Sequence, residues 1–455
     1  MGGFGFNLNP TGLGLGSGID VQATVNQLVQ AAEAPEQAMV QEQQLLSSQS
    51  SALNNLNSLL SSLQTAVDAL QGPNGLLNAE ATTSSDPTVV TATADPGATL
   101  GTYSITVGQL ATVSSYYTGE LTSADTTFGT GQFNLQMGTG APVTITVDNT
   151  DNTLNGLAAY INNNSQNPGV TANVISDSNG SRLSLVSNTS GAPGDLQISG
   201  NSTGLSFTKA ATGTNASFTL DGVPLSSSTN SVTTALPGVT LNLVGTSSSP
   251  VSVSITPDTT QATAAVNNFV SAYNAVVQAI NAQFTYAQGG TQPPLFSDNT
   301  LAQVQQTLAN DVNYAIPGTG GPTTLATFGV NVQQDGTLSV DTGTLTSALS
   351  GNFSAVQSFF QSATNGFATN FSNDLTTLTD PTKGALYIDL QGISQDQAAV
   401  TQQISDFQAN VAQQQQTWTQ QFSQVNATLQ TLPLLLAQID AQLGLTSSSS
   451  TGGIP

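Results

Sequence analysis

The stretch that decides the fold is residues 46–70, LSSQSSALNNLNSLLSSLQTAVDAL. Apolar residues recur in it every seven positions, in two rows: Leu46, Leu53, Leu60 and Val67, then Leu56, Leu63 and Leu70. An apolar seam with this spacing holds one face of a helix against a partner helix. The sequence therefore predicts a helix over residues 21–70, broken or kinked at Pro35 and capped by Asp20, that forms a coiled coil.

A matching seam lies near the other end of the chain. Its heptad positions are Ile404, Val411, Trp418, Val425, Leu432 and Ile439. A second row shifts by one residue near Gln414, and the opposite face is Gln, Ser, Thr and Asn. We predict a helix over residues 386–443, with a kink at Pro433, that coils with the N-terminal helix or with copies of itself. Core packing explains Trp418 better than stacking on a ligand does.

The seams supply the candidate site residues. We expect assembly contacts from ten of them, although several can instead pack the stem itself: Leu46, Leu53, Leu56, Leu60, Leu63, Ile404, Val411, Trp418, Phe422 and Val425.

Residues 82–257 have a different pattern, with short alternating runs separated by Gly, Asn, Asp and Pro. Residues 102–107 and 251–255 read as half-buried strands. Asn179-Gly180, between two alternating runs, predicts a hairpin whose two central residues both have positive φ. Asp148, Asp151 and Asp177 could suggest calcium, but their spacing fits no known calcium loop, so we interpret them as turn residues.

Helical periodicity returns after Asp258. The predicted core positions of the first helix are Ala265, Phe269, Tyr273, Val276, Val277 and Ile280. Leu301, Val304 and Leu308 start another helix, and residues 344–360 are predicted to be helical as well. Between them, Asp335-Gly336 predicts a second hairpin.

Charge is scarce and one-sided. Only 6% of the 455 residues are charged, and 26 acids face three bases, Arg182, Lys209 and Lys383, for a net charge of -23. Nucleic-acid binding is not expected, because phosphate contacts need clustered Lys and Arg. We interpret the acidity as a means of solubility; the sharper hypothesis is adaptation to acidic surroundings, because hydroxyls and amides keep a surface hydrated when carboxylates are protonated.

The chain has no Cys and no His. Disulfides, thiol nucleophiles, zinc sites of the usual types and histidine-based serine triads are thereby excluded. No paired-carboxylate motif is present either, so we expect no enzyme, no cofactor and no metal.

The N-terminal region suggests neither a signal peptide nor a nucleotide loop. It lacks a basic segment followed by an apolar run, and Gly12 to Gly18 is followed by no Lys-Ser/Thr, so we interpret it as a flexible arm. No apolar run reaches the roughly 18 residues of a membrane span. Because the composition is nevertheless typical of extracellular proteins, we expect export without a cleaved signal. The Ser-rich tail after Gly444 is predicted to be disordered.

Short motifs in a fixed order carry a family resemblance. They are Gly16-Ser-Gly-Ile-Asp20, Ser84-Ser-Asp-Pro87, Gly101-Thr-Tyr-Ser-Ile-Thr-Val107, Phe218-Thr-Leu-Asp-Gly-Val223 with Gly238-Val-Thr-Leu-Asn-Leu243, and Asp335-Gly-Thr-Leu338. Leu154 to Asn162 and Val170 to Leu185 are similar to the "IN" repeat of flagellins and hook proteins. In this order the motifs resemble the flagellar filament cap, or hook-associated protein 2, family. Gln and Ser stand where members of that family usually carry charges on the terminal coils, so salt-bridged assembly contacts are not expected.

The resemblance implies an α+β multidomain fold with a terminal α-helical coiled-coil stem, a mixed helical leg domain and inserted β-rich head domains. It divides the chain into a terminal arm and helix (1–40), a coiled-coil part of the leg (41–78), a head domain in two parts (79–118 and 213–258), an inserted outer head domain with the IN-like repeat (119–212), the rest of the leg (259–425), and a last helix and tail (426–455).

The resemblance also implies a function. It predicts a structural cap at the distal tip of the bacterial flagellum that promotes folding and insertion of exported flagellin and prevents its loss, and so supports motility. The implied partners are further copies of the chain as a pentamer or hexamer, flagellin, hook-filament junction proteins and the export chaperone of the flagellar type III system, with no membrane insertion. The alternatives are an extracellular oligomeric adhesin that binds glycans through the head, or another axial flagellar component such as a junction protein.

Overall fold

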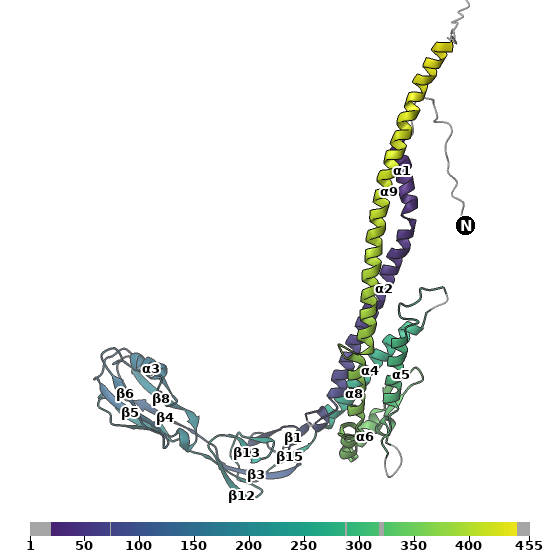
Figure 1. The fold of residues 1–455 in the computed structure, drawn as a ribbon. Helices are drawn as coiled ribbons and strands as arrows, with labels where there is room; N and C mark the ends of the chain where they lie inside the picture. Colours follow the sequence, from purple (N-terminus) through teal and green to yellow (C-terminus); the bar gives the residue numbers. More distant parts are fainter. Residues whose placement is uncertain (1–19, 73, 287–288, 318–322, 444–455) are drawn as a thin grey trace, which may run out of the picture. The chain divides into compact units, whose positions relative to one another are not determined.

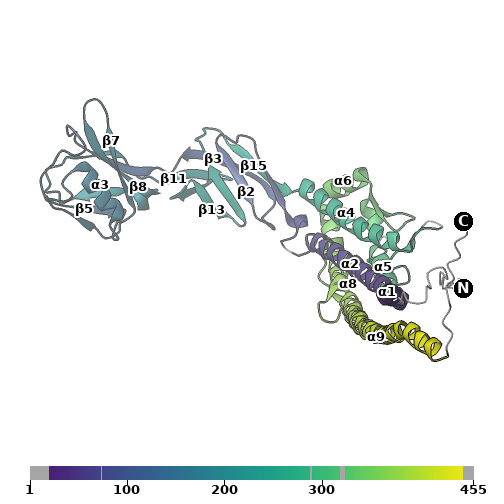
Figure 2. The same ribbon diagram turned by 90° about the horizontal axis from the view of Figure 1, so that it is seen from above.

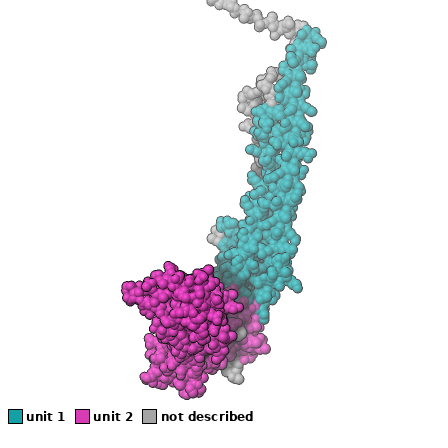
Figure 3. Space-filling view, turned by 90° about the vertical axis from the view of Figure 1, so that its left-hand side faces the viewer, with its two compact units in different colours: residues 1–64, 272–310, 373–455 teal, residues 65–271, 311–372 magenta. Residues whose placement is uncertain are grey.

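The computed structural model describes residues 20–72, 74–286, 289–317 and 323–443. The chain divides into two compact units, shown in two colours in Figure 3. Unit 1 comprises residues 1–64, 272–310 and 373–455, and unit 2 comprises residues 65–271 and 311–372. Each unit combines early and late parts of the chain. The glycine-rich arm and the serine-rich tail lie outside the described residues.

Helices supply the described part of unit 1. They are α1 (Val21–Ala32), α2 (Ala34–Asp68), α4 (Thr259–Phe284), α5 (Asn299–Val312), α8 (Phe367–Thr379) and α9 (Ala385–Leu443), of which α2, α4, α5 and α8 also give residues to unit 2. The predicted N-terminal cap is confirmed, because the Asp20 carboxylate accepts a hydrogen bond from the Ala23 N–H at 3.0 Å. The predicted break near Pro35 is confirmed too, at Glu33 between α1 and α2.

The predicted core of α4 is also confirmed, because its six apolar positions are all buried. The helix predicted to start at Leu301 is confirmed as α5, and the three apolar residues that predicted it are buried too. Helix α9 spans almost the residues predicted for it and contains Pro433 within its length. A proline there leaves one carbonyl of the preceding turn without its helical N–H donor.

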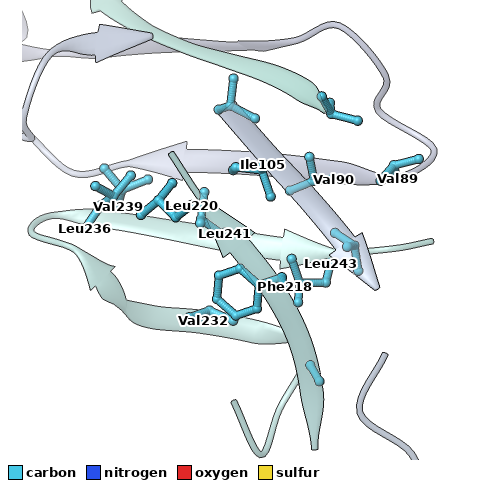
Figure 4. Packing of buried hydrophobic residues seen from close by; sticks show 14 of the residues in the cluster. Val89, Val90, Ile105, Phe218, Leu220, Val232, Leu236, Val239, Leu241 and Leu243 are labelled. Atoms are coloured by element: carbon cyan, nitrogen blue, oxygen red, sulfur yellow. The ribbon is translucent and has the colours of Figure 1, made fainter. Parts of the chain in front are cut away.

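Two sheets and one apolar core form the first β region of unit 2. One sheet has the order β1-β15-β3-β11-β12 and the other β13-β14-β2, all antiparallel. The strands are β1 (Glu80–Ser84), β2 (Val90–Ala94), β3 (Gly101–Gln109), β11 (Ala216–Leu220), β12 (Val223–Ser227), β13 (Ser231–Leu236), β14 (Val239–Leu243) and β15 (Val251–Pro257). Figure 4 shows side chains of both sheets meeting between them, Phe218 and Leu241 among them. The two strands expected at residues 102–107 and 251–255 are thereby confirmed as β3 and β15.

Two smaller sheets and a helix form the second β region. The sheets have the orders β10-β4-β8-β7 and β6-β5-β9. The elements are β4 (Val113–Thr118), β5 (Gly131–Met137), β6 (Val143–Val147), α3 (Leu154–Asn163), β7 (Val170–Ser176), β8 (Ser181–Ser190), the short 3-10 helix η3 (Ala192–Gly194), β9 (Leu196–Ser199) and β10 (Phe207–Ala211). Figure 2 shows α3 beside strands β5 and β8. Its buried Leu157 and Ile161 belong to the same core as Phe133 and Leu185.

The hairpin predicted around Asn179-Gly180 exists, but its turn was predicted wrongly. Strands β7 and β8 pair up to Ser176 and Ser181, which leaves four residues in the turn, and the Asp177 carboxylate accepts hydrogen bonds from the N–H groups of Asn179 and Gly180. An aspartate that bonds the backbone two residues on builds a turn without positive φ at Asn179. The interpretation of Asp177 as a turn residue is thereby confirmed.

The tight two-residue turn occurs elsewhere, between β11 and β12. Asp221 has φ 49° and Gly222 has φ 82°, the left-handed pair that a two-residue hairpin requires. The Asp221 carboxylate also accepts from the Ser104 N–H at 2.7 Å. This turn therefore ties β11 and β12 to β3.

The remaining part of unit 2 corrects one predicted helix. Residues 344–360 are not one helix but two, α6 (Thr342–Gly351) and α7 (Phe353–Gln361), because Asn352 leaves the helical conformation and its side chain caps α7. The 3-10 helices η2 (Leu76–Asn78) and η4 (Leu325–Phe328) and the hairpin of β16 (Val330–Val332) and β17 (Leu338–Val340) complete the unit. That hairpin, predicted around Asp335-Gly336, is thereby confirmed, and its loop has five residues, 333–337.

Candidate assembly surface

Helix α9 lies antiparallel to the N-terminal helices within unit 1. Gln408 donates a side-chain hydrogen bond to Glu36 at 2.5 Å, and Gln43 donates one to Thr401 at 2.9 Å. Glu36 and Gln43 are seven residues apart in α2, and their partners Gln408 and Thr401 are seven residues apart in the opposite direction in α9. The register of the two helices is therefore constant between these two contacts. Figure 1 shows α1 continuing beside α9 and α9 running past the end of α1. The two ends of the chain therefore pair with each other, one of the two arrangements predicted.

The exposure of apolar residues changes along α9. In the half that begins at Ala385, Leu386 is 1% exposed, Val400 5% and Val411 8%. Beyond the level of α1, in contrast, Val425 is 46% exposed and Leu434 is 71% exposed. We call the exposed set the distal stripe: Val425, Leu429, Leu432, Leu434, Leu435, Leu436 and Ile439. Within the described residues, nothing covers this stripe.

The distal stripe lies in a part of the chain without charge. Residues 407–439 contain no Asp, Glu, Lys or Arg. Contiguous apolar side chains of this kind, bordered by amides and hydroxyls, mark surfaces that bind other proteins. Burial of the leucines would supply the free energy of such binding, at about 25 cal/mol per Å² of apolar surface. Glutamine and asparagine at its border can donate and accept hydrogen bonds.

The ten predicted assembly residues fall into three groups. Four are buried within the chain at 0–3% exposure and therefore pack the fold: Leu53, Leu56, Leu60 and Leu63. Val411 is nearly buried as well, and four more are half-buried: Leu46, Ile404, Trp418 and Phe422. Val425 alone among the ten belongs to the distal stripe. Contact of any of them with another molecule stays a prediction.

The sequence reasoning missed most of the distal stripe. Leu429, Leu432, Leu436 and Ile439 belonged to the recognised heptads but were not chosen, and Leu434 and Leu435 lay on no seam. The signal was present in residues 432–436, LPLLL, where apolar residues occupy every face of the helix. A helix that is apolar all round is normally covered on more than one side.

No helix in the described ranges is long and apolar enough to cross a membrane.

Family models match three parts of the chain. The model of the flagellar hook-associated protein 2 N-terminus matches residues 17–114, and that of its C-terminus matches residues 213–433. The chain belongs to the flagellar hook-associated protein 2 family. The flagellin hook IN motif matches residues 128–189, between the two family models, so the predicted similarity to the IN repeat is confirmed.

Similar proteins agree with this family. The B-type flagellar hook-associated protein 2 of Pseudomonas aeruginosa is 28% identical over 410 residues, which cover 83% of this chain and 85% of that protein. The flagellar hook-associated protein 2 of Escherichia coli K12 is 27% identical over 469 residues, covering 96% and 98%. A crystal structure of the D1-D2-D3 domains of the flagellar cap protein FliD from Escherichia coli has a TM-score of 0.63 at 28% identity, over 75% of this chain and 99% of that one.

The family fixes the general role of the chain. Flagellar hook-associated protein 2 is the filament cap, a structural protein of the bacterial flagellum. The predicted fold class is confirmed as well, because helical and β-rich parts occur both here and in the Escherichia coli cap structure.

Proposed function

We propose that this chain caps the distal end of the flagellar filament as a ring of five or six copies, promotes the folding and insertion of exported flagellin, and prevents flagellin loss. Family membership supports this proposal for the general role. The distal stripe is the observation that carries the detail, because a free apolar helix face at one end of a coiled stem is suited to docking among the helices of filament subunits.

The chemistry of the stripe suits a cap that must release and rebind. Ion pairs would fix one partner geometry through directed contacts, whereas uncharged apolar and amide contacts tolerate small shifts between partners. The absence of charge over residues 407–439 therefore favours adjustable contacts with flagellin. The half-buried Trp418 and Phe422 would continue the same surface toward the covered part of α9.

The β regions complete the proposal. We infer that the head domains, with the domain limits predicted from the sequence, form a plate beneath which arriving flagellin folds. Export through the flagellar apparatus with its chaperone, and contact with the junction proteins below the filament, belong to the same proposal. Each follows from the family role.

Deletion of the gene tests the cap function. We expect cells without motility and flagellin in the medium as unpolymerised monomer. Filaments of normal length combined with loss of attachment to surfaces would contradict the cap function and favour a glycan-binding adhesin.

Complementation of the deletion tests the distal stripe. The triple variant Leu429→Ser, Leu432→Ser, Leu436→Ser should be produced and exported, yet leave the cells non-motile with monomeric flagellin in the medium. The matched control replaces exposed amides that lie off the face of these three leucines, Gln424→Ser, Gln430→Ser and Gln438→Ser, and should restore motility. Full motility with the leucine variant would remove the stripe from the proposal.

A further inference from the structure

Two carboxyl groups face each other in unit 1, where α9 packs on the start of α5. Asp298 caps α5, since its carboxylate accepts a hydrogen bond from the Leu301 N–H at 2.9 Å. Asp389, in the second turn of α9, is hydrogen-bonded by the Thr300 side chain and lies against the Asp298 carboxyl. Its Oδ2 atom is buried without a hydrogen-bond donor. A proton on either carboxyl would supply the missing donor, because two ionised carboxylates can only accept.

In the part of unit 1 that the structure describes, no cation compensates this pair. Among residues 43–64 of α2 and residues 272–310, which include the later part of α4 and most of α5, Asp298 is the only charged residue. The later part of α8 brings Asp374. Along α9 itself, Asp396 is exposed, and Lys383, the one base of unit 1, acts on Asp380. Two like charges in contact, partly removed from water, disfavour their own ionisation.

The physical consequence is a raised affinity for protons. Burial in the first place, and the Asp298 charge in the second, raise the pKa of Asp389 from 3.8 to about 6. The folded chain therefore holds a proton between about pH 4 and 6 that the unfolded chain has released. By linkage, the stability that the pair contributes is present in acid and is lost as the pH rises to 6 and above.

We propose that Asp298 and Asp389 form a proton-sharing clasp that holds α9 against the start of α5 in acid and loosens in neutral solution. This inference concerns the stiffness of the helical unit and does not depend on the proposed capping function. In acid the Asp389 hydroxyl donates to the Asp298 carboxylate, and the carboxylate keeps its bond to the N–H of Leu301. At neutral pH Asp389 has lost its proton, and its charge is repelled by the Asp298 charge across the α9–α5 contact.

Hydrogen exchange of the full-length protein at pH 4.5 and pH 7.5 tests the clasp. A two-unit rise in pKa corresponds to at most about a hundredfold change in local opening, and solvent around the partly exposed Asp389 reduces it. We expect the protection factors of residues 385–400 and 299–305 to be about tenfold higher at pH 4.5. The chain has no His, so no imidazole titrates in this interval.

Three variants separate the clasp from a general effect of acid. Asp389→Asn carries a permanent donor and should give high protection at both pH values. Asp396→Asn removes an exposed carboxylate of the same helix and should keep the wild-type pH dependence. Asp298→Asn keeps a capping acceptor for α5 and abolishes the repulsion between residues 298 and 389. This variant replaces Asp389→Asn in the test if Asp389→Asn does not fold.

The outcomes are exclusive. Loss of pH dependence in Asp389→Asn but not in Asp396→Asn supports the clasp. Equal pH dependence in wild type and Asp389→Asn, or no pH dependence in the wild type, overturns it. Carboxyl carbon NMR of the wild-type protein tests the proposal without a variant. The Asp389 carboxyl should titrate near pH 6, and titration near pH 4 would overturn the proposal.

Discussion

The two ends of α9 carry the same kind of apolar heptad in different surroundings. Near Ala385 the seam residues are buried, with Val400 5% exposed, whereas near Leu443 the seam continues with Leu432 42% exposed. The difference arises from α1 and α2, which lie beside the first part of α9 and end before the second. Periodicity thus identifies the residues that share a face, but the partner determines whether that face is part of a core or a surface. Two predictions test this contrast, and a third tests the loop that leads into α9.

The largest effect is expected where a seam is covered. Leu60 in α2 is fully buried, so Leu60→Ala should lower the free energy of unfolding by about 2–5 kcal/mol, because the removed side chain leaves a cavity. Urea unfolding followed by circular dichroism measures it. Leu434→Ala, at 71% exposure, is the matched control and should change stability by no more than about 0.5 kcal/mol. Similar losses in both variants would refute the contrast between the buried seam and the exposed distal stripe.

A smaller effect is expected at the limit between the two parts of α9. Asp20→Ala removes the cap of α1 and should cost about 1 kcal/mol of that helix. Hydrogen exchange should then rise in α1 and in the part of α9 beside it, around Trp418, while residues 430–439 keep their wild-type exchange. Asp20→Asn retains the capping acceptor and should behave as wild type; a loss as large as that of Asp20→Ala would show that the cap is not the cause.

The smallest effect is expected at the loop that leads into α9. The Thr382 hydroxyl and N–H both donate to Asp380 and lower the pKa of that carboxyl below 3.8. The stabilisation is therefore present above pH 3.8 and is lost as the pH falls through the lower value. In Thr382→Ala, carboxyl NMR should show the pKa of Asp380 moving back up toward 3.8, whereas Thr382→Ser keeps the donor and the low pKa. An unchanged value in the alanine variant would exclude the hydroxyl as the cause.

The sequence allowed the elements of this fold to be predicted better than their turns and surroundings. Heptads and strand alternation are local patterns, so the helix limits near Ala385 and Leu443 and the strands around Ile105 and Ile255 were predicted closely. The turn at Asp177 was not, because a side-chain acceptor there replaces the backbone conformation that Asn-Gly usually supplies. The break at Asn352 was missed because its flanking residues keep a helical apolar pattern.

The candidate site was predictable only in part. The heptads correctly placed Leu53 and Val425 on seams, and Leu53 is buried in α2. The sequence does not show where α1 begins beside α9, and this limit decides that Val425 is exposed. The carboxyl pair of Asp298 and Asp389 could not be foreseen at all. These residues are distant in sequence, and only the packing of α5 against α9 brings them together.

The pairing of Glu36 with Gln408 joins residues 372 positions apart. A chain that leaves a ribosome or a narrow channel with its N-terminus first cannot close this contact until nearly all of it has emerged. Strands β4 to β10, in contrast, need only a segment of about one hundred residues, so local topology lets them fold earlier. The long-range contacts of unit 1 therefore delay its folding, and the coiled stem is completed only after α9, its last helix, has left the ribosome or channel.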